Sequence, residues 1–80
     1  MKTFYYTEIE KPAKFGRKIE QRIYKIQKGI PELLTTHEFN TSSCMGNESE
    51  AFQGLVNAGI LPAKYRHKYS REIPHKLYKM

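Results

Sequence analysis

Aromatic and β-branched residues alternate with polar ones at the start of the chain, which is the pattern of a strand with one buried face. These side chains, which favour extended backbone, fill the segment 2–9, Lys-Thr-Phe-Tyr-Tyr-Thr-Glu-Ile. The pattern ends before Pro12, because proline has no N–H group to donate to a neighbouring strand. We therefore predict a strand over 2–9 and a loop over 12–16.

The region 17–40 fits two different periodicities, and the choice decides which of its residues share a face. The first is helical, because four isoleucines follow the spacing of one helix face. Gly29 followed by Pro31 is also typical of a helix end. The residues of this helical stripe are Ile19, Ile23, Ile26 and Ile30.

The second periodicity is that of a β-hairpin. Residues 22–26, Arg-Ile-Tyr-Lys-Ile, favour a strand, and Lys28-Gly29 lies midway between them and residues 32–36, as a two-residue turn requires. The hairpin leaves fewer residues unexplained, so we predict strands near 19–27 and 30–39 in an antiparallel meander with the first strand. Its register pairs Tyr24 with Leu33, Ile23 with Leu34, and Lys25 with Glu32 as opposite charges.

Residues 48–58 carry the signals of a helix. Asn47 occupies a cap position with Glu50 three residues on, and carboxylates in the first turn suit the helix dipole. Gly59 followed by Pro62 is a helix-ending signature. The apolar residues with helical spacing between these signals are Phe52, Leu55 and Val56.

A second, shorter helix is expected over 63–69. Pro62 suits the position at which such a helix starts, because the missing N–H group is not needed there. Tyr65 and Tyr69 are four residues apart and would share one face of it. Several cations lie between them, so this helix is expected to be basic.

The chain beyond the second helix is expected to be a flexible basic tail over 72–80, because Pro74 prevents further helix. The whole pattern predicts an α+β fold: a small antiparallel sheet of about three strands packs against one α-helix, followed by the short basic helix. The predicted core consists of Phe4, Tyr6, Ile23, Ile26, Leu33, Phe52, Leu55, Val56 and Ile60.

The length of 80 residues suffices for one domain, 1–80, and for no second core. A single Cys excludes an intramolecular disulfide, and a reduced thiol indicates the cytoplasm. The start of the chain lacks the apolar run of a signal peptide, and no segment approaches the roughly 18 apolar residues of a membrane span. We therefore expect a soluble cytoplasmic protein.

The net charge of +6 is distributed unevenly along the chain. Residues 1–28 contain eight Lys or Arg and three Glu, whereas residues 29–63 contain four Glu and no Lys or Arg. Residues 64–80 then contain six Lys or Arg and one Glu. Two basic segments thus flank an acidic one, which suggests an anionic partner.

Two clusters of cations are candidates for binding that partner. The run 64–71 interleaves Lys and Arg with tyrosines, and this mixture suits nucleic acid because cations neutralise phosphates and rings stack on unpaired bases. The plainer interpretation is that the tyrosines pack on the sheet and the charges are merely solvated. The sequence leaves open whether the two clusters meet. The candidate binding residues are Lys14, Arg17, Lys18, Arg22, Lys64, Tyr65, Arg66, Lys68, Tyr69 and Arg71.

Catalytic and metal-binding chemistry has little support in the sequence. The chain contains no Asp and no glycine-rich phosphate loop. His67 and His75 are eight residues apart, and His37 and Cys44 seven, which is too far for a local zinc-binding pair. Cys44 precedes a helix N-terminus, which favours a thiolate, although a small half-buried residue fits equally well. We expect no metal and no cofactor.

The leading hypothesis is a small basic non-enzymatic regulator that binds nucleic acid or a nucleic-acid-handling protein complex, similar in style to small proteins encoded by phages and plasmids. The alternative is a protein inhibitor that docks on an enzyme or polymerase without contacting nucleic acid. The third is a metal-independent RNase. Its proton-transfer groups would come from Arg66, His67, Tyr69, Arg71 and His75. No membrane and no small-molecule cofactor are expected as partners.

Overall fold

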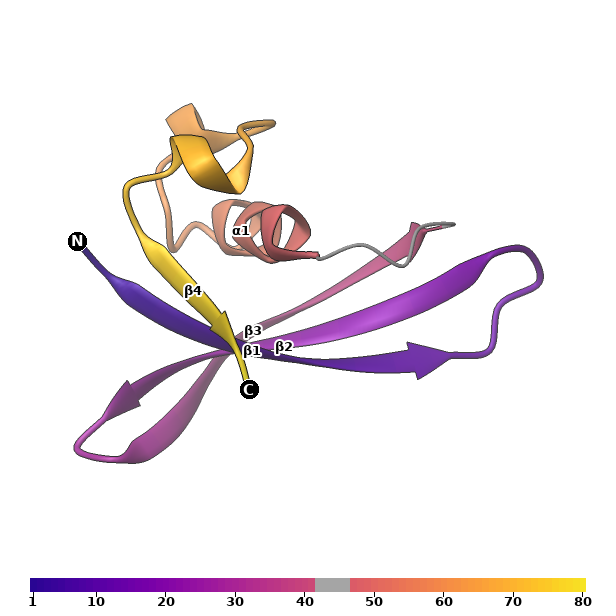
Figure 1. The fold of residues 1–80 in the computed structure, drawn as a ribbon, viewed down its shortest axis with the longest axis horizontal. Helices are drawn as coiled ribbons and strands as arrows, with labels where there is room; N and C mark the ends of the chain where they lie inside the picture. The colour runs from indigo at the N-terminus through magenta and orange to yellow at the C-terminus, as the bar shows by residue number, and fades with distance from the viewer. Residues whose placement is uncertain (42–46) are drawn as a thin grey trace.

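Strands form the centre of the molecule. The structure, a computed structural model that describes residues 1–41 and 47–80, contains β1 (Thr3–Lys11), β2 (Arg17–Gln27), β3 (Ile30–Thr41), α1 (Glu48–Asn57), the 3₁₀ turns η1 (Ala63–Tyr65) and η2 (Ser70–Glu72), and β4 (Lys76–Lys79). The sheet order is β3-β2-β1-β4, and α1, η1 and η2 lie on one side of it (Figure 1). This arrangement confirms the predicted α+β class. Within the described ranges, no helix is long and apolar enough to cross a membrane.

The region 17–40 is a hairpin, which confirms the second of the two periodicities. β2 and β3 pair antiparallel along their lengths. Between them Lys28 and Gly29 have φ angles of 53° and 77°, and two successive positive φ angles are what a type I′ turn requires. The chirality of this turn matches the twist of the two strands, so the dipeptide sets where the hairpin folds back.

A bulge in β3 changes the predicted register. Ile23 pairs with Thr35 and not, as predicted, with Leu34, because β3 has one extra residue at this point. Leu34 is left without a partner across the ladder and packs against the core. The pairs nearer to the turn keep the predicted register: Tyr24 with Leu33, and Lys25 with Glu32, whose Nζ and Oε2 atoms are 3.0 Å apart.

The position of α1 confirms the predicted helix, but its start is stabilised differently. At its end Gly59 has a φ of 76°, and the N–H of Ile60 donates to the carbonyl of Leu55 at 3.0 Å, as in a Schellman motif. At its start Asn47 is the N-cap residue, but the predicted side-chain cap is absent. The Asn47 amide donates instead to Glu8 Oε2 at 2.8 Å.

The core lies between α1 and one face of the sheet. Two predicted core residues, Ile26 and Leu33, are 37 % and 53 % exposed, because they share with Tyr24 the face turned away from α1. Ile60 is partly buried and packs against the core. Ala51, Leu61 and Ile73 are also buried in the core, although they were not predicted there. The remaining predicted core residues are buried as expected: Phe4, Tyr6, Ile23, Phe52, Leu55 and Val56.

The segment 63–69 does not form the predicted basic helix. η1 is a single turn, Arg66 after it is extended, and His67 has a φ of 63°, outside the helical region. Within the segment the backbone forms only short turns, such as the hydrogen bonds from the N–H of Arg66 to the carbonyl of Ala63 at 3.0 Å and from the N–H of Lys68 to the carbonyl of Tyr65 at 3.2 Å. Other backbone groups bond to α1. The N–H of His67, for example, donates to Gln53 Oε1 at 2.9 Å.

The residues 76–79 form β4, which corrects the expectation of a flexible tail. β4 pairs in parallel with β1, and the N–H of Lys76 donates to the carbonyl of Lys2 at 2.9 Å. Leu77 packs against the core. Four residues of alternating pattern become a strand only because a partner strand from the other end of the chain lies beside them, and local sequence does not show this partner.

Gly54 sets the distance between α1 and the sheet. A β-carbon built on Gly54 would lie 2.7 Å from the Cβ of His37 and 3.2 Å from the Cδ1 of Ile23. These separations are shorter than van der Waals contact, so only a residue without a side chain lets the helix backbone approach this closely.

Replacing Gly54 by Ala should therefore destabilise the fold, although Ala favours helix by about 1 kcal/mol. The added methyl group meets a β-carbon that cannot swing away, and we expect a cost in the upper part of the range of about 1–3 kcal/mol for overpacking. Chemical denaturation measures the change in the free energy of unfolding. Asn57→Ala, at an exposed site of the same helix, serves as the control and should be nearly neutral. An unchanged or raised stability of Gly54→Ala would contradict the close contact.

Candidate nucleic-acid interface

Glutamates neutralise most of the N-terminal cations that the sequence proposes. Lys18 Nζ lies 3.3 Å from Glu38. Arg22 Nε lies 3.3 Å from Glu20. Lys11 connects the two pairs, at 2.9 Å from Glu20 and 2.8 Å from Glu38, and its hydrogen bonds hold the pKa of both carboxyls below the ordinary value. The strands therefore carry a closed network of ion pairs here.

Arg17 and Lys14 lie near the loop between β1 and β2. Arg17 donates a hydrogen bond from Nε to Glu10. Lys14 has no ion pair with a described residue, and its Nζ lies 5.9 Å from the centre of the Phe15 ring. In Figure 1 this loop is at one end of the molecule, whereas η1 and η2 lie above α1 towards the other end. The two clusters therefore do not form one continuous patch.

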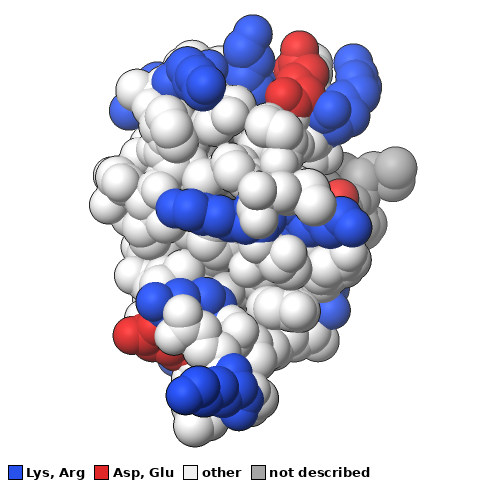
Figure 2. Space-filling view, turned by 90° about the vertical axis from the view of Figure 1, so that its left-hand side faces the viewer, with Lys and Arg blue, Asp and Glu red and all other residues white. Residues whose placement is uncertain are grey.

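Four of the C-terminal cations are different, because they lack acidic partners. Lys64, Arg66, Lys68 and Arg71 form no ion pair with a carboxylate in the described part of the chain, whereas Lys79 Nζ lies 3.2 Å from Glu8. Figure 2 shows several Lys and Arg side chains at the top of the molecule, where η1 and η2 lie. We call this group the C-terminal basic surface: Lys64, Arg66, Lys68 and Arg71.

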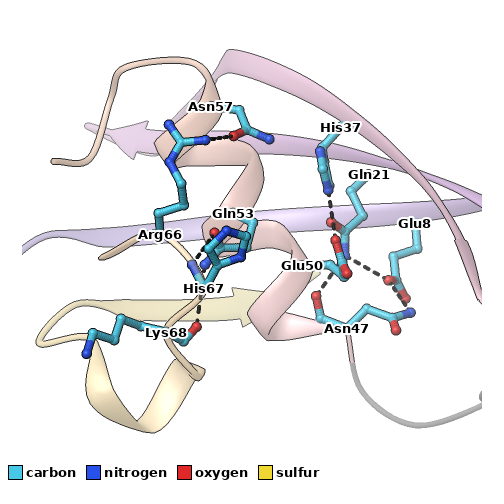
Figure 3. A network of polar contacts seen from close by, with 10 residues as sticks. All are labelled: Glu8, Gln21, His37, Asn47, Glu50, Gln53, Asn57, Arg66, His67 and Lys68. Carbon is cyan, nitrogen blue, oxygen red and sulfur yellow. Dashed lines mark hydrogen bonds and ion pairs between the residues drawn. The ribbon is translucent and has the colours of Figure 1, made fainter. Parts of the chain in front are cut away.

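The side chain of Gln53 on α1 holds the backbone that carries these cations (Figure 3). Its Oε1 accepts from the N–H of His67 at 2.9 Å. Its Nε2 donates to the carbonyl of Tyr65 at 3.1 Å and to that of Lys68 at 3.4 Å. One half-buried amide thus replaces the hydrogen bonds that a helix would have supplied, and it fixes the positive φ of His67.

Further contacts fix the second half of the segment. The N–H of Ser70 donates to Ser49 Oγ on α1 at 3.1 Å. The N–H of Tyr69 donates to Glu72 Oε2 at 2.8 Å, which closes η2 like a capping box. The cations therefore extend from a backbone that α1 holds in place.

The two tyrosines of this segment have different surroundings. Tyr65 is half-buried, packs against the core, and meets His75 edge-on with ring centres 5.7 Å apart. Tyr69 is 60 % exposed, and the guanidinium of Arg71 lies 4.8 Å from its ring centre. Tyr65 is thus mainly a packing residue, and Tyr69 is the one that a partner can reach.

A second polar network joins the start of α1 to the sheet (Figure 3). Gln21 is fully buried, and its Nε2 donates to Glu8 Oε2 and to the carbonyl of Asn47, both at 3.0 Å. Burial alone raises the pKa of Glu8, but hydrogen bonds from Asn47, Gln21 and Lys79 outweigh it and hold the pKa below 4.5. His37 Nε2 lies 3.0 Å from Glu50 on the same helix. This network replaces the predicted helix cap.

The histidines proposed for catalysis are not brought together by any contact in the described residues. His75 accepts a hydrogen bond from the N–H of Lys2 at 3.0 Å, and burial, the N-terminal amine and nearby lysines lower its pKa. His67 is exposed and its backbone is held by Gln53. The described residues contain no cluster of His, Cys, Asp or Glu that could hold a metal ion. Cys44 lies outside the described residues.

Sequence reasoning missed one set of surface residues. Tyr5, Tyr24 and Tyr78 lie side by side on the sheet face turned away from α1. The alternation in β1 already placed Tyr5 opposite to Phe4 and Tyr6. The sequence therefore indicates which face Tyr5 occupies. That Tyr24 and Tyr78 lie beside it depends on the strand register and on the presence of β4.

The chain matches no protein-family model, no curated protein and no solved structure in the comparisons with known proteins. The contacts and charges of the chain itself are therefore the basis for its function.

Replacing Gln53 by Ala removes the hydrogen bonds to His67, Tyr65 and Lys68 at once, so the backbone of this segment should open more often. We expect faster amide hydrogen exchange at His67 and faster tryptic cleavage after Lys68, with unchanged protection in the centre of β2. Asn57→Ala is a matched control, because it removes only a 3.4 Å contact with Arg66. Unchanged exchange at His67 would show that Gln53 does not hold the segment.

Because the pKa of Glu8 is lowered in the folded state, the stability of the fold should decrease at acidic pH. A carboxyl with a lower pKa in the folded state stabilises the fold above the unfolded value of about 4.5, and this contribution is lost as the pH falls through the folded value. Denaturation at a series of acidic pH values should therefore show a steep fall in stability for the natural protein and a shallower one for Glu8→Gln. Identical slopes would mean that the Glu8 network does not shift the pKa.

Proposed function

We propose that this protein is a small non-enzymatic regulator that binds nucleic acid, alone or within a nucleic-acid-handling complex, through the C-terminal basic surface. The observation that carries the proposal is the unequal pairing of cations. Lys18 and Arg22 have carboxylate partners, whereas Lys68 and Arg71 have none in the described part of the chain. An unpaired cation can neutralise a phosphate and release its counterion, but a paired one must first leave its carboxylate.

The rigidity of this surface supports the proposal. Gln53 and Ser49 fix the backbone of the basic segment, so less conformational entropy is lost when its side chains meet a ligand. Tyr69 adds an exposed ring beside Arg71, and this pair offers stacking and charge at one point.

The electrostatic field of the same side of the molecule also supports it. Figure 2 shows Lys and Arg at the top, across the middle and at the bottom of this side, with few acidic groups between them. A net charge of +6 attracts a polyanion at long range, and the cations on this side contribute to that attraction. The proposed site of action is the cytoplasm, where the single Cys stays reduced.

Charge reversal at two positions tests the proposal. In Lys68→Glu/Arg71→Glu, binding of fluorescent oligonucleotides should weaken strongly, and the slope of log affinity against log salt should shrink by about 1 for each phosphate that is no longer neutralised. Lys14→Glu/Lys28→Glu changes the net charge equally, at residues that also lack ion pairs with described residues, and should leave the slope nearly unchanged. Fluorescence anisotropy over a range of salt concentrations measures both.

Two results would reject the proposal. Equal weakening in the two double variants would show that net charge acts without the C-terminal basic surface. Absence of nucleic-acid binding in the natural protein would leave direct docking on a protein as the better explanation. Recovery of a specific protein from nuclease-treated lysate would then identify that target.

A further inference from the structure

A row of tyrosines crosses the sheet face turned away from α1. Tyr5 pairs with Tyr24 on one side and with Tyr78 on the other, so the three side chains project from adjacent strands to the same face. The ring centres of Tyr5 and Tyr78 are 5.9 Å apart, with an angle of 36° between the planes. We call Tyr78, Tyr5 and Tyr24 the tyrosine row.

The tyrosine row is open to a ligand. α1, η1 and η2 all lie on the other side of the sheet, and no described element covers this face (Figure 1). Tyr78 is 49 % exposed, and Tyr5 and Tyr24 are half-buried between their neighbours. None of the three belongs to the hydrophobic core. The rings therefore form a surface and not a packing layer.

A cation without a carboxylate partner lies beside the row. Lys76 precedes Tyr78 by two residues on β4, so its side chain leaves the strand on the same face, and it has no ion pair with a described carboxylate. A shallow groove of about 270 Å³ at the β4 edge is lined by Arg71, Lys76 and Tyr78, together with Glu48, Phe52, Ser70, His75 and Leu77. This groove connects the C-terminal basic surface with the edge of the tyrosine row.

We infer that the tyrosine row stacks the unpaired bases of a single-stranded nucleic acid whose phosphates lie along Arg71 and Lys76. The inference rests on the proposed function and adds a preference for single strands. Stacking on an aromatic side chain needs an exposed base face, and in a duplex the base faces are already stacked on one another. Phosphates leaving the C-terminal basic surface through the groove reach Tyr78 first.

Charge favours this occupant over a second copy or another protein. The charged side chains at the far end of this face, Lys11, Lys18, Glu20 and Glu38, already pair with one another. They leave no free charge there for a protein partner. A second copy placed face to face would add a second Lys76 and no new carboxylate to pair with it. An anion with flat apolar groups matches both the cation and the rings.

Tyrosine substitutions test this inference with oligothymidylate and oligouridylate of about 16 nucleotides, and with a duplex of the same length, as fluorescent probes. Tyr78→Ala should bind the single strands roughly 5- to 150-fold more weakly, the range expected for removal of one stacking ring, and Tyr24→Ala should act in the same direction. Tyr78→Phe keeps the ring and should retain binding. Duplex binding, which needs only phosphates, should not change.

Two further measurements separate stacking from a change in structure. Phe15→Ala, which removes an 82 % exposed ring beyond the far end of β1, is the control and should leave every affinity unchanged. Since the chain has no Trp, its fluorescence comes from six Tyr, three of them in the tyrosine row, and stacked bases should quench this signal in the natural protein but less in Tyr78→Ala. Thermal unfolding verifies that each variant is folded.

The outcomes distinguish the two proposals. Equal affinity for single strands and duplex, unchanged by Tyr78→Ala, would overturn the inference and leave the proposed function intact. Absence of binding to every probe would overturn both. A dimer in sedimentation velocity that Tyr78→Ala disrupts would overturn the inference in favour of a second copy on this face.

Discussion

The contact between α1 and the sheet at Gly54 positions most of the other features of this protein. It brings the helix close enough for Asn47 to reach Glu8 at one end of the helix. On the outer side of the helix, Gln53 and Ser49 then hold the segment that carries the C-terminal cations. That segment has only single 3₁₀ turns of its own, so the helix determines its shape. One close packing contact therefore connects the core with the proposed binding surface.

The distribution of glutamates matters as much as that of the cations. Glu20 and Glu38 lie on neighbouring strands, so these two carboxylates pair with three cations, Lys11, Lys18 and Arg22. Glu72 is the only acidic residue in 64–80, and its carboxylate accepts a backbone hydrogen bond instead. The same kind of positive charge thus has different effects in the two basic segments. Whether a cation lacks a carboxylate partner, and not the number of cations in its segment, decides whether it can meet a phosphate.

Local signals in the sequence predict those elements whose causes are local. The turn at Lys28-Gly29 depends on two adjacent positive φ angles and the helix end on one at Gly59, and a glycine in each signals the change of direction. The sequence did not predict β4, because this strand forms only against β1. It did not predict the bulge at Leu34 either, because the bulge is linked to the packing of Leu34 against the core and not to the local pattern. The candidate cations stay a prediction. Whether a given cation has a carboxylate partner, as Lys18 has, depends on strand register, and the local pattern shows this register only in part.

The bulge in β3 also affects the free edge of the sheet. β3 is an outer strand of twelve residues, long enough to offer its backbone groups to another extended chain. The extra residue at Leu34 breaks the regular ladder, so an incoming strand aligned with one half of β3 is out of step with the other half. Pro31 removes a donor and Glu38 adds charge along the same edge. The protein thereby discourages runaway sheet growth and aggregation along its longest exposed strand.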